Sequence, residues 1–300
     1  EVRGSEKIFR TEHQITTLLE KVNLPVNARV LDYGCGKAST LKGLCGRRDD
    51  VVPFVFDVGE QYRPFWNGFV PATNQAISEV PVRWAGQMDA VLSFFALEHV
   101  TDPRAFVCAV HGLLKEGGAF YFLVPNIFAN TADLVVADHV NHFSAQSLQR
   151  LLVDAGFTVR EINGEAHNSA WVVVAEKSEG VGVEAETKSI SQSVHEMAAY
   201  WNEFGDRVSV FEKAGSGAAA IYGSGFYGTF IHASLEQPEA VVCFLDQNPH
   251  RQQQVLLGKP IVSPEALPET VQRLYVGLNP RVAQTELAAE PLPELEMFLP

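Results

Sequence analysis

Cysteine is scarce in this sequence and shows no metal-binding or disulfide spacing. Four cysteines occur among 300 residues, and none belongs to a CxxC pair. Zinc sites and disulfide frameworks both depend on paired or closely spaced cysteines. We therefore expect neither, and the composition favours a reducing, cytoplasmic setting. The four residues are Cys35, Cys45, Cys108 and Cys243.

Positive charge and long apolar runs are also lacking. Acidic residues outnumber basic ones by 36 to 23, which gives a formal net charge of −13. Such a field repels nucleic acid and anionic lipid surfaces. No segment approaches the roughly 20 apolar residues that span a bilayer, and the first ten residues, EVRGSEKIFR, lack the apolar centre of a signal peptide. We expect a soluble protein with a small-molecule substrate, and no nucleic-acid or membrane partner.

The first half of the chain alternates apolar strands with amphipathic helices. Ile15, Leu18 and Val22 recur at helical spacing, and runs rich in Val and Phe follow. Strands that alternate with helices require crossovers and a parallel sheet buried on both faces. We predict a Rossmann-like α/β domain over residues 1–180. Its expected helices cover 12–22 and 147–157, and its expected strands cover 30–31, 51–58, 88–97, 118–126 and 171–177.

The second half of the chain shows the same alternation of strands and helices over fewer residues. The segment 178–188, SEGVGVEAETK, is polar and aperiodic, as linkers are. An apolar stripe at helical spacing then runs from Val194 to Phe211, which is typical of a core or domain-interface helix. Strands are expected at 218–222, 240–246 and 273–279. We predict a second, smaller Rossmann-like α/β domain over 189–300.

A glycine turn follows the strand that ends at Asp32, in the run VLDYGCG. Gly34 and Gly36 let the backbone turn sharply and approach a ligand closely. Asp57 closes the next strand, where a carboxylate can accept hydrogen bonds from both hydroxyls of a ribose. Taken alone, these glycines would be ordinary strand-to-helix turns. The four residues together indicate an adenosine-containing cofactor.

With MDAVLSFFALEHV and LLKEGGAFYFLVPN, this pattern resembles class I methyltransferases over residues 12–177. The resemblance implies S-adenosyl-L-methionine as cofactor, with its methionyl part near Asp32, Gly34 and Gly36, and its ribose at Asp57. It places the adenine near residues 73–75, at Asn74. Ala38 stands where this loop often has a third glycine, which favours a methyltransferase over a dinucleotide dehydrogenase.

Two histidine clusters are candidates for catalysis. Methyl transfer is an in-line displacement, so the enzyme aligns the acceptor and, where the acceptor carries a proton, supplies a base. Glu98 and His99 follow a strand at the ligand-binding end of the sheet, although a histidine there often only packs under the cofactor. Asp138 and His139 precede a helix whose N-cap we expect to be Ser144.

The second cluster leaves a metal site open as an alternative. Asp138, His139 and His142 carry ligand types that bind divalent ions. The sequence does not show whether the three side chains of this loop share one geometry, and we expect no metal here.

The segment DHVNHFSAQSLQRLL resembles the C-methyltransferases of deoxysugar biosynthesis more closely. The resemblance implies that His139 abstracts the acceptor proton, that Asp138 supports it, and that His99 binds or polarises a substrate oxygen. Asp138 replaces the glutamate usual in that family, and Val136 replaces a tyrosine. The cysteine-rich zinc module of that family has no counterpart among these cysteines.

In the second half, GSGFYG supplies Gly223, Gly225 and Gly228, and Asp246 ends the next strand. This is the dinucleotide fingerprint. It could hold a redox cofactor, hold the nucleotide part of an acceptor, or serve as a structural lid. The last two are favoured, because no hydride-transfer constellation follows the turn.

Together these observations predict a methyltransferase that modifies a sugar or nucleotide-linked sugar in carbohydrate biosynthesis. An O- or N-methyltransferase of another small metabolite is the first alternative. An NAD-binding oxidoreductase or a non-catalytic nucleotide-binding regulator is the alternative from a different class.

Overall fold

The computed structural model describes residues 2–3, 6–7, 9–178, 190–288 and 292–300. The chain divides into two compact units, residues 1–129 with 133–188, and residues 130–132 with 189–300. Apart from Ser178, the expected linker lies outside the described residues. The short segment 130–132 belongs to the second unit although it lies within the first half of the sequence.

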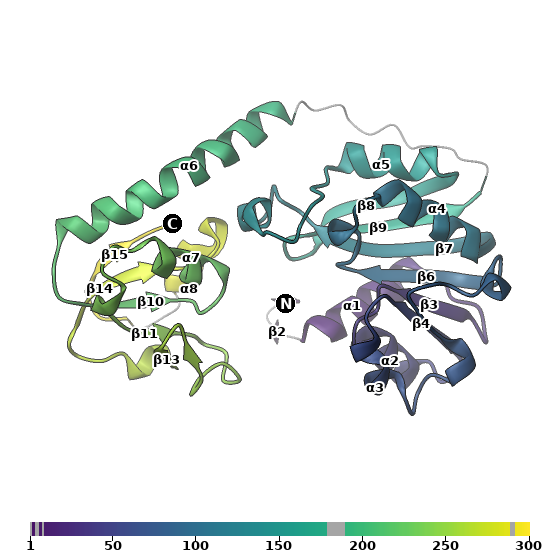
Figure 1. The fold of residues 1–300 in the computed structure, drawn as a ribbon, viewed down its shortest axis with the longest axis horizontal. Coiled ribbons are helices and arrows are strands. Elements are labelled where there is room, and N and C mark those ends of the chain that lie inside the picture. Colours follow the sequence, from purple (N-terminus) through teal and green to yellow (C-terminus); the bar gives the residue numbers. More distant parts are fainter. Residues whose placement is uncertain (1, 4–5, 8, 179–189, 289–291) are drawn as a thin grey trace. The chain divides into compact units, whose positions relative to one another are not determined.

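A seven-stranded sheet forms the centre of the first unit, in the order β5-β4-β3-β6-β7-β9-β8 (Figure 1). The first five strands in this order are parallel, while β9 runs antiparallel to both β7 and β8. The expected parallel sheet is therefore mixed at one edge. The strands are β3 Arg29–Tyr33, β4 Val52–Asp57, β5 Gln75–Ile77, β6 Met88–Phe94, β7 Leu114–Pro125, β8 Phe157–His167 and β9 Ala170–Lys177.

Apolar clusters cover both faces of this sheet. One joins residues of α1 and α2 to Val30 and Tyr121, and the other joins residues of α4 and α5 to Leu31 and Phe120. Burial on two faces explains why the strands read as continuous apolar runs. The helices are α1 Arg10–Lys21, α2 Ser39–Arg47, α3 Arg63–Trp66, α4 Pro103–Leu113 and α5 Ala145–Asp154.

Shorter elements complete the first unit. Single 3₁₀ turns occupy Glu60–Tyr62, Ala72–Asn74, Val82–Trp84 and Leu97–His99, and β1 Val2–Arg3 pairs with β2 Glu6–Lys7. A further 3₁₀ turn, Thr131–Val135, begins in the second unit and ends in the first. The expected N-cap of α5 is confirmed, because the Ser144 side chain accepts a hydrogen bond from the Ser147 N–H.

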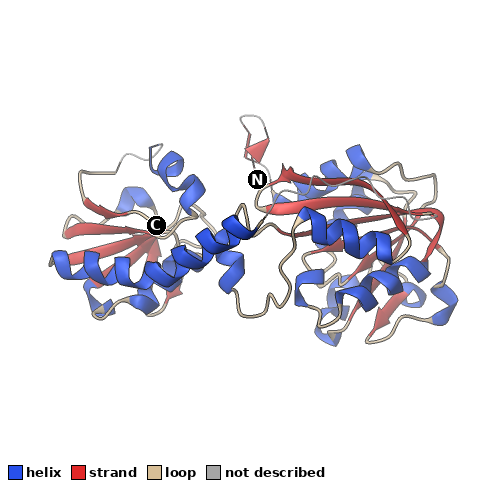
Figure 2. Ribbon diagram, turned by 90° about the horizontal axis from the view of Figure 1, so that it is seen from above, coloured by secondary structure: helices blue, strands red, loops and turns tan. Residues whose placement is uncertain are grey.

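The second unit has a six-stranded sheet in the order β12-β13-β11-β10-β14-β15, with helices on both faces (Figure 2). Met197, Phe204 and Val208 of its long first helix are buried, as the stripe predicts. The elements are α6 Ser191–Ala214, β10 Ala218–Tyr222, α7 Phe226–Ser234, β11 Val241–Leu245, β12 Val255–Leu256, β13 Lys259–Val262, β14 Val271–Val276, α8 Pro280–Ala288 and β15 Glu296–Phe298, with 3₁₀ turns at Pro238–Ala240 and Pro264–Ala266.

Candidate functional site

A cavity of about 840 Å³ opens at the carboxyl ends of β3, β4 and β6. β3 pairs with β4 on one side and with β6 on the other, so the strand order reverses here. Loops diverge at such a switch point and leave a crevice for a ligand. Four predicted site residues line this cavity, namely Gly34, Gly36, Asp57 and His99.

The two glycines of the turn serve different purposes. Gly34 has φ +78°, and a Cβ there would lie 2.7 Å from the Cβ of Ala96, so a side chain would clash. Gly36 has φ +49°, but a Cβ there would meet no atom within 4 Å. Gly34 therefore permits a close approach of two loops, whereas Gly36 keeps the cavity wall open to a ligand.

Asp57 fixes this turn from the end of β4. The Gly36 N–H donates to its Oδ2 at 2.7 Å, and the Gly59 N–H donates to its Oδ1 at 2.8 Å. The indole N–H of buried Trp66 donates to the Gly36 carbonyl at 2.7 Å. A carboxylate offers about four acceptor positions, so each Asp57 oxygen keeps one for a vicinal diol.

Two predicted cofactor residues lie away from the cavity wall. Asp32 is 2% exposed and its Oδ1 has no hydrogen-bond partner among the described residues. Burial, with a smaller contribution from Asp57, raises its pKa to about 8. Asn74 donates instead to the Pro53 carbonyl at 3.2 Å and is not among the cavity-lining residues. The expected adenine contact at Asn74 therefore does not belong to this cavity.

Glu98, His99 and His139 form one cluster. One potential ligand atom of each lies within 4.8 Å of the others, and the two imidazole rings meet edge to face with centroids 5.0 Å apart. Glu98 is 1% exposed, and neither of its carboxylate oxygens has a hydrogen-bond partner in the described structure. Sequence motifs far apart in the chain are thus brought together, close enough to share a proton or a cation.

The acids pair with these histidines differently from the expectation. The Asp138 carboxylate, 76% exposed, lies 3.6 Å from His99 Nδ1, whereas the acid paired with His139 Nδ1 is Asp133, also at 3.6 Å. The backbone N–H of His139 donates to the Val136 carbonyl, and this hydrogen bond closes a tight turn. The charge of Asp138 still raises the pKa of His139, so the expected support of His139 by Asp138 stays a prediction beside the Asp133 pair.

The tautomer of neutral His99 follows from its partner. Its Nδ1 lies 2.8 Å from the Asp138 backbone carbonyl, which can only accept a hydrogen bond, so Nδ1 carries the proton. Nε2 then keeps its lone pair and lies 3.9 Å from Glu98 Oε1. Burial raises the pKa of Glu98 to about 8 and, together with His99, lowers that of His139. Near neutral pH, Glu98 is mostly protonated and His139 is neutral.

Three further residues shape the site without a strong sequence signal. Asn141 holds residues 133–142, which we call the histidine loop, to the turn that follows β6. Its backbone N–H donates to the Glu98 carbonyl at 3.1 Å, and its side chain donates to the Val100 carbonyl at 2.5 Å. Phe95 lines the cavity with φ +56°, a conformation rare for a bulky residue. Neither of these residues, nor Asp133, belongs to a motif that spacing alone would reveal.

The glycine turn predicted for the second unit is present between β10 and α7. A Cβ on Gly228 would lie 1.9 Å from the Gly223 carbonyl oxygen, so this glycine is required for close helix-to-strand packing. Gly225 is the N-cap of α7. Asp246 accepts the N–H and the O–H of Ser224 and the N–H of Asn248.

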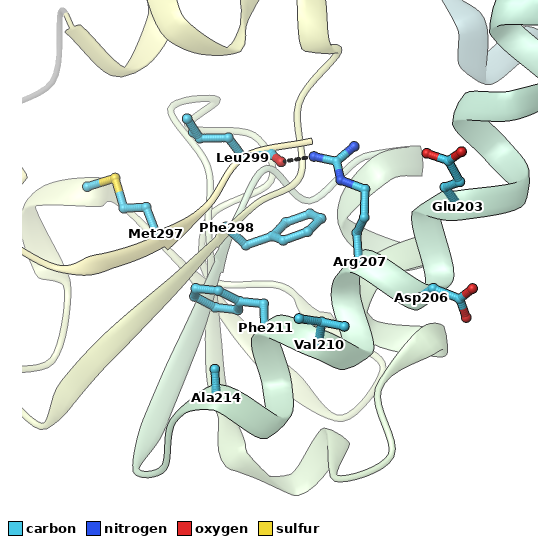
Figure 3. Close-up of a pocket in the computed structure, with 9 residues that line it drawn as sticks. All are labelled: Glu203, Asp206, Arg207, Val210, Phe211, Ala214, Met297, Phe298 and Leu299. Carbon is cyan, nitrogen blue, oxygen red and sulfur yellow. Dashed lines mark hydrogen bonds between the residues drawn. The ribbon is translucent and has the colours of Figure 1, made fainter.

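A separate cavity of about 550 Å³ lies within the second unit, between α6 and β15 (Figure 3). Arg207 donates to the Leu299 carbonyl at 2.8 Å, and its guanidinium lies 5.5 Å from the centre of the Phe298 ring. Glu203 and Asp206 line it as well. None of the predicted site residues lies here.

Comparison with known proteins identifies the first unit. The profile of a family described as "Methyltransferase domain" matches residues 7–162. The chain belongs to this methyltransferase family. Residues 7–162 form an S-adenosylmethionine-dependent methyltransferase domain, and its α/β fold is the one expected.

Curated relatives of this methyltransferase match about half of the chain. Ubiquinone biosynthesis O-methyltransferase of Xanthomonas axonopodis pv. citri is 28% identical over 153 residues, 49% of this chain and 62% of the relative. The protein of the same name from Acinetobacter baumannii (strain AYE) is 28% identical over 189 residues, 53% of this chain and 78% of the relative. The chain thus spans less than two thirds of the Xanthomonas protein.

Solved structures give lower similarity. The complex between the Haloferax volcanii Trm112 methyltransferase activator and the putative methyltransferase gives 16% identity, a TM-score of 0.48 and coverage of 56% of this chain and 90% of that chain. A putative methyltransferase from Bacillus halodurans gives 14% identity and a TM-score of 0.45, with coverage of 54% of this chain and 98% of that chain. No described helix of this methyltransferase has both the length and the apolar character needed to cross a membrane.

The cavity fits the cofactor on the protein's own geometry. Its volume lies in the range of roughly 300–1,000 Å³ that small-molecule sites occupy, Gly36 leaves its wall open, and Asp57 keeps acceptor capacity at that wall. When bound, S-adenosylmethionine supplies an electrophilic methyl group on a sulfonium. Gly34, Gly36 and Asp57 are the residues that would hold it at this wall.

Proposed function

We propose that this methyltransferase acts on a small molecule whose acceptor atom carries a proton, and that the imidazole pair His99 and His139 handles that proton. The observation that carries the proposal is the position of His99. Its ring lines the same cavity as Gly36 and Asp57, and it contacts the ring of His139. One site thus combines cofactor-binding geometry with a group able to accept a proton.

The roles follow from the protonation states. His139 is neutral near pH 7 because burial lowers its pKa, so it can act as the base. His99 borders the cavity and binds the acceptor, with Nδ1 held by the Asp138 carbonyl. Glu98 is mostly protonated, and its Oε1 lies 3.9 Å from His99 Nε2, beyond hydrogen-bond distance. The hydroxyl or acidic C–H of the acceptor loses its proton as the new bond to the methyl group forms.

A sugar or nucleotide-linked sugar is the proposed acceptor. The support is the resemblance of the 138–152 segment to deoxysugar C-methyltransferases. A phenolic hydroxyl is the second candidate, because two relatives at 28% identity are named ubiquinone biosynthesis O-methyltransferases. The cytoplasmic setting and the nucleotide or acceptor role of Gly223, Gly225, Gly228 and Asp246 remain predictions of the sequence.

The test is release of S-adenosylhomocysteine from S-adenosylmethionine with a thymidine-diphosphate-linked keto-deoxysugar and, separately, with a catechol. We expect turnover with one of them and a loss of about 10²–10⁴-fold for His139→Ala, the range typical of a positioned base. His142→Ala is the matched control from the same loop. Unchanged turnover in His139→Ala would refute the assigned base. Loss of turnover in EDTA, restored by Mg²⁺, would replace the base with a cation at the same cluster.

A further inference from the structure

The dinucleotide-like turn of the second unit leads directly to a buried tyrosine. Tyr227 is the second residue of α7, which begins directly after Gly225, and it is 6% exposed. A Cβ on Gly277 of the neighbouring strand end would lie 2.5 Å from the Cα of Gly228. The glycines therefore let α7 approach the sheet closely, and this packing determines where Tyr227 lies.

The hydroxyl of Tyr227 binds a short piece of chain from the first half of the sequence. It donates to Asn130 Oδ1 and accepts from the Ala132 N–H, both at 3.1 Å, and Thr131 Oγ1 lies 3.1 Å away. One donor and two acceptor positions are thereby used, which is the full capacity of a phenol. All three residues belong to the second unit.

Trp201 of α6 completes the attachment. Its indole N–H donates to the Thr131 carbonyl at 2.8 Å, and its ring stacks on that of Tyr227 with centroids 5.8 Å apart and an interplanar angle of 17°. Two aromatic side chains from two helices thus hold three consecutive residues through both backbone and side-chain atoms. We call Tyr227 and Trp201 the aromatic clamp.

The chain leaves the aromatic clamp and enters the histidine loop without an intervening linker. Asp133, the acid paired with His139, directly follows Ala132, and the loop continues to the Asp138 carbonyl that holds His99 Nδ1. A restraint on residues 130–132 therefore limits the conformations open to residues 133–139. Catalytic groups displaced by about 1 Å can lose rate by roughly 10²-fold, so such a restraint matters for catalysis.

We propose that Tyr227 and Trp201 are positioning residues for methyl transfer, and that the GSGFYG turn of the second unit serves to place this aromatic clamp. The inference rests on the proposed function insofar as it concerns His139. It assigns the second unit a task that needs no dinucleotide. The clamp acts on the reaction through the histidine loop, and neither of its residues is among those that line the cavity.

Tyr227→Phe in the full chain tests this, because it removes the hydroxyl and keeps the ring stacked on Trp201. Tyr222→Phe is the matched control: Tyr222 is a buried tyrosine of the same unit whose hydroxyl accepts from Gln247 at 3.0 Å. We expect amide hydrogen exchange of residues 130–140 to accelerate about tenfold in Tyr227→Phe, the effect of losing about one net buried hydrogen bond. The control should leave this segment unchanged. Equal exchange in the two variants would overturn the proposal.

Two further measurements separate positioning from simple destabilisation. Binding of S-adenosylhomocysteine by calorimetry should stay within about twofold of the parent, because neither clamp residue lines the cavity. The imidazole titration of His139 by NMR should move toward its ordinary pKa as the loop loosens, which the control should not do. Weakened S-adenosylhomocysteine binding in Tyr227→Phe would indicate general damage and would count against the proposal.

Turnover then distinguishes the clamp from the assigned base. With the acceptor that supports turnover in the assay proposed above, Tyr227→Phe should lower kcat about tenfold and leave KM for S-adenosylmethionine unchanged. If His139→Ala keeps full turnover, the assigned base fails while the exchange result still decides the clamp. If Tyr227→Phe exchanges faster but turns over normally, the clamp restrains the loop without positioning catalysis, and the proposal is wrong.

Discussion

The N–H of Gly36 donates to Asp57 Oδ2 at 2.7 Å, and this hydrogen bond joins the glycine turn after β3 to the acidic end of β4. The second unit repeats the relationship, because the Ser224 N–H donates to Asp246 Oδ2 at 3.2 Å. The two turns differ in how many hydrogen bonds their carboxylates can still accept. Asp57 accepts two donors from the described residues, whereas Asp246 accepts three.

Asp57→Ala should weaken binding of S-adenosylhomocysteine by about 100-fold, since it removes charged acceptors worth roughly 1.5–3 kcal/mol each and releases the turn. Isothermal calorimetry measures the change. Asp89→Ala is the matched control: its carboxylate also accepts a backbone N–H, from Arg29 at 2.8 Å, but it does not line the cavity. An equal loss of affinity in both variants would show that the effect is not local to the turn.

Substitution of the two glycines should separate stability from binding. Gly34→Ala brings a Cβ within 2.7 Å of Ala96 at φ +78°, so we expect a loss of about 2–4 kcal/mol in unfolding free energy. Gly36→Ala adds only backbone strain of about 1 kcal/mol but narrows the cavity, so cofactor affinity should fall more than stability. Urea unfolding and calorimetry measure the two. Gly46→Ala, in open space at a helical position, serves as control.

Glu98 should make the folded protein less stable as the pH rises. Its pKa increases from 4.5 in the unfolded chain to about 8 in the folded protein because of burial. The folded state therefore binds more protons between these values, and stability declines from about pH 4.5 to about pH 8 by a few kcal/mol. Asp32 acts in the same direction.

Glu98→Gln keeps the shape of this side chain and removes its titration. Unfolding free energies measured from pH 5 to 9 should decline less steeply than in the parent, and the variant should be the more stable of the two at pH 9. Glu116→Gln, at a side chain 81% exposed, should retain the parent slope. If Glu98→Gln also retains the parent's decline of stability with pH, Glu98 is ionised in the folded protein.

Titration with NADH should give no saturable binding, while S-adenosylhomocysteine binds. A vicinal diol needs two acceptor positions, and Asp246 retains about one of its four. Intrinsic tryptophan fluorescence or calorimetry on the full chain decides the matter. Saturable NADH binding that is lost in Asp246→Ala would establish a dinucleotide site in the second unit and contradict this reading of the turn.

Much of the first unit is predictable from local pattern. The strands at β3, β4, β6 and β9 and the helices α1 and α5 lie where apolar spacing and the Ser144 cap place them, because these signals involve neighbours in sequence. β8, β12, β13 and β15 were not predicted. β8 alternates little, and β12 and β15 have only two and three residues, so strand periodicity gives them no clear local signal.

The sequence by itself determined the fold class, the glycine turn and the carboxylate of Asp57, since φ preferences and strand-end chemistry act within a few residues. Only the tertiary structure decided the partners of the histidines. Asp133 rather than Asp138 pairs with His139, Glu98 is buried without a hydrogen-bond partner among the described residues, and residues 130–132 join the second unit. The Asp133–His139 pair depends on the conformation of one loop, and the other two relationships depend on contacts between residues far apart in the chain; local spacing encodes neither.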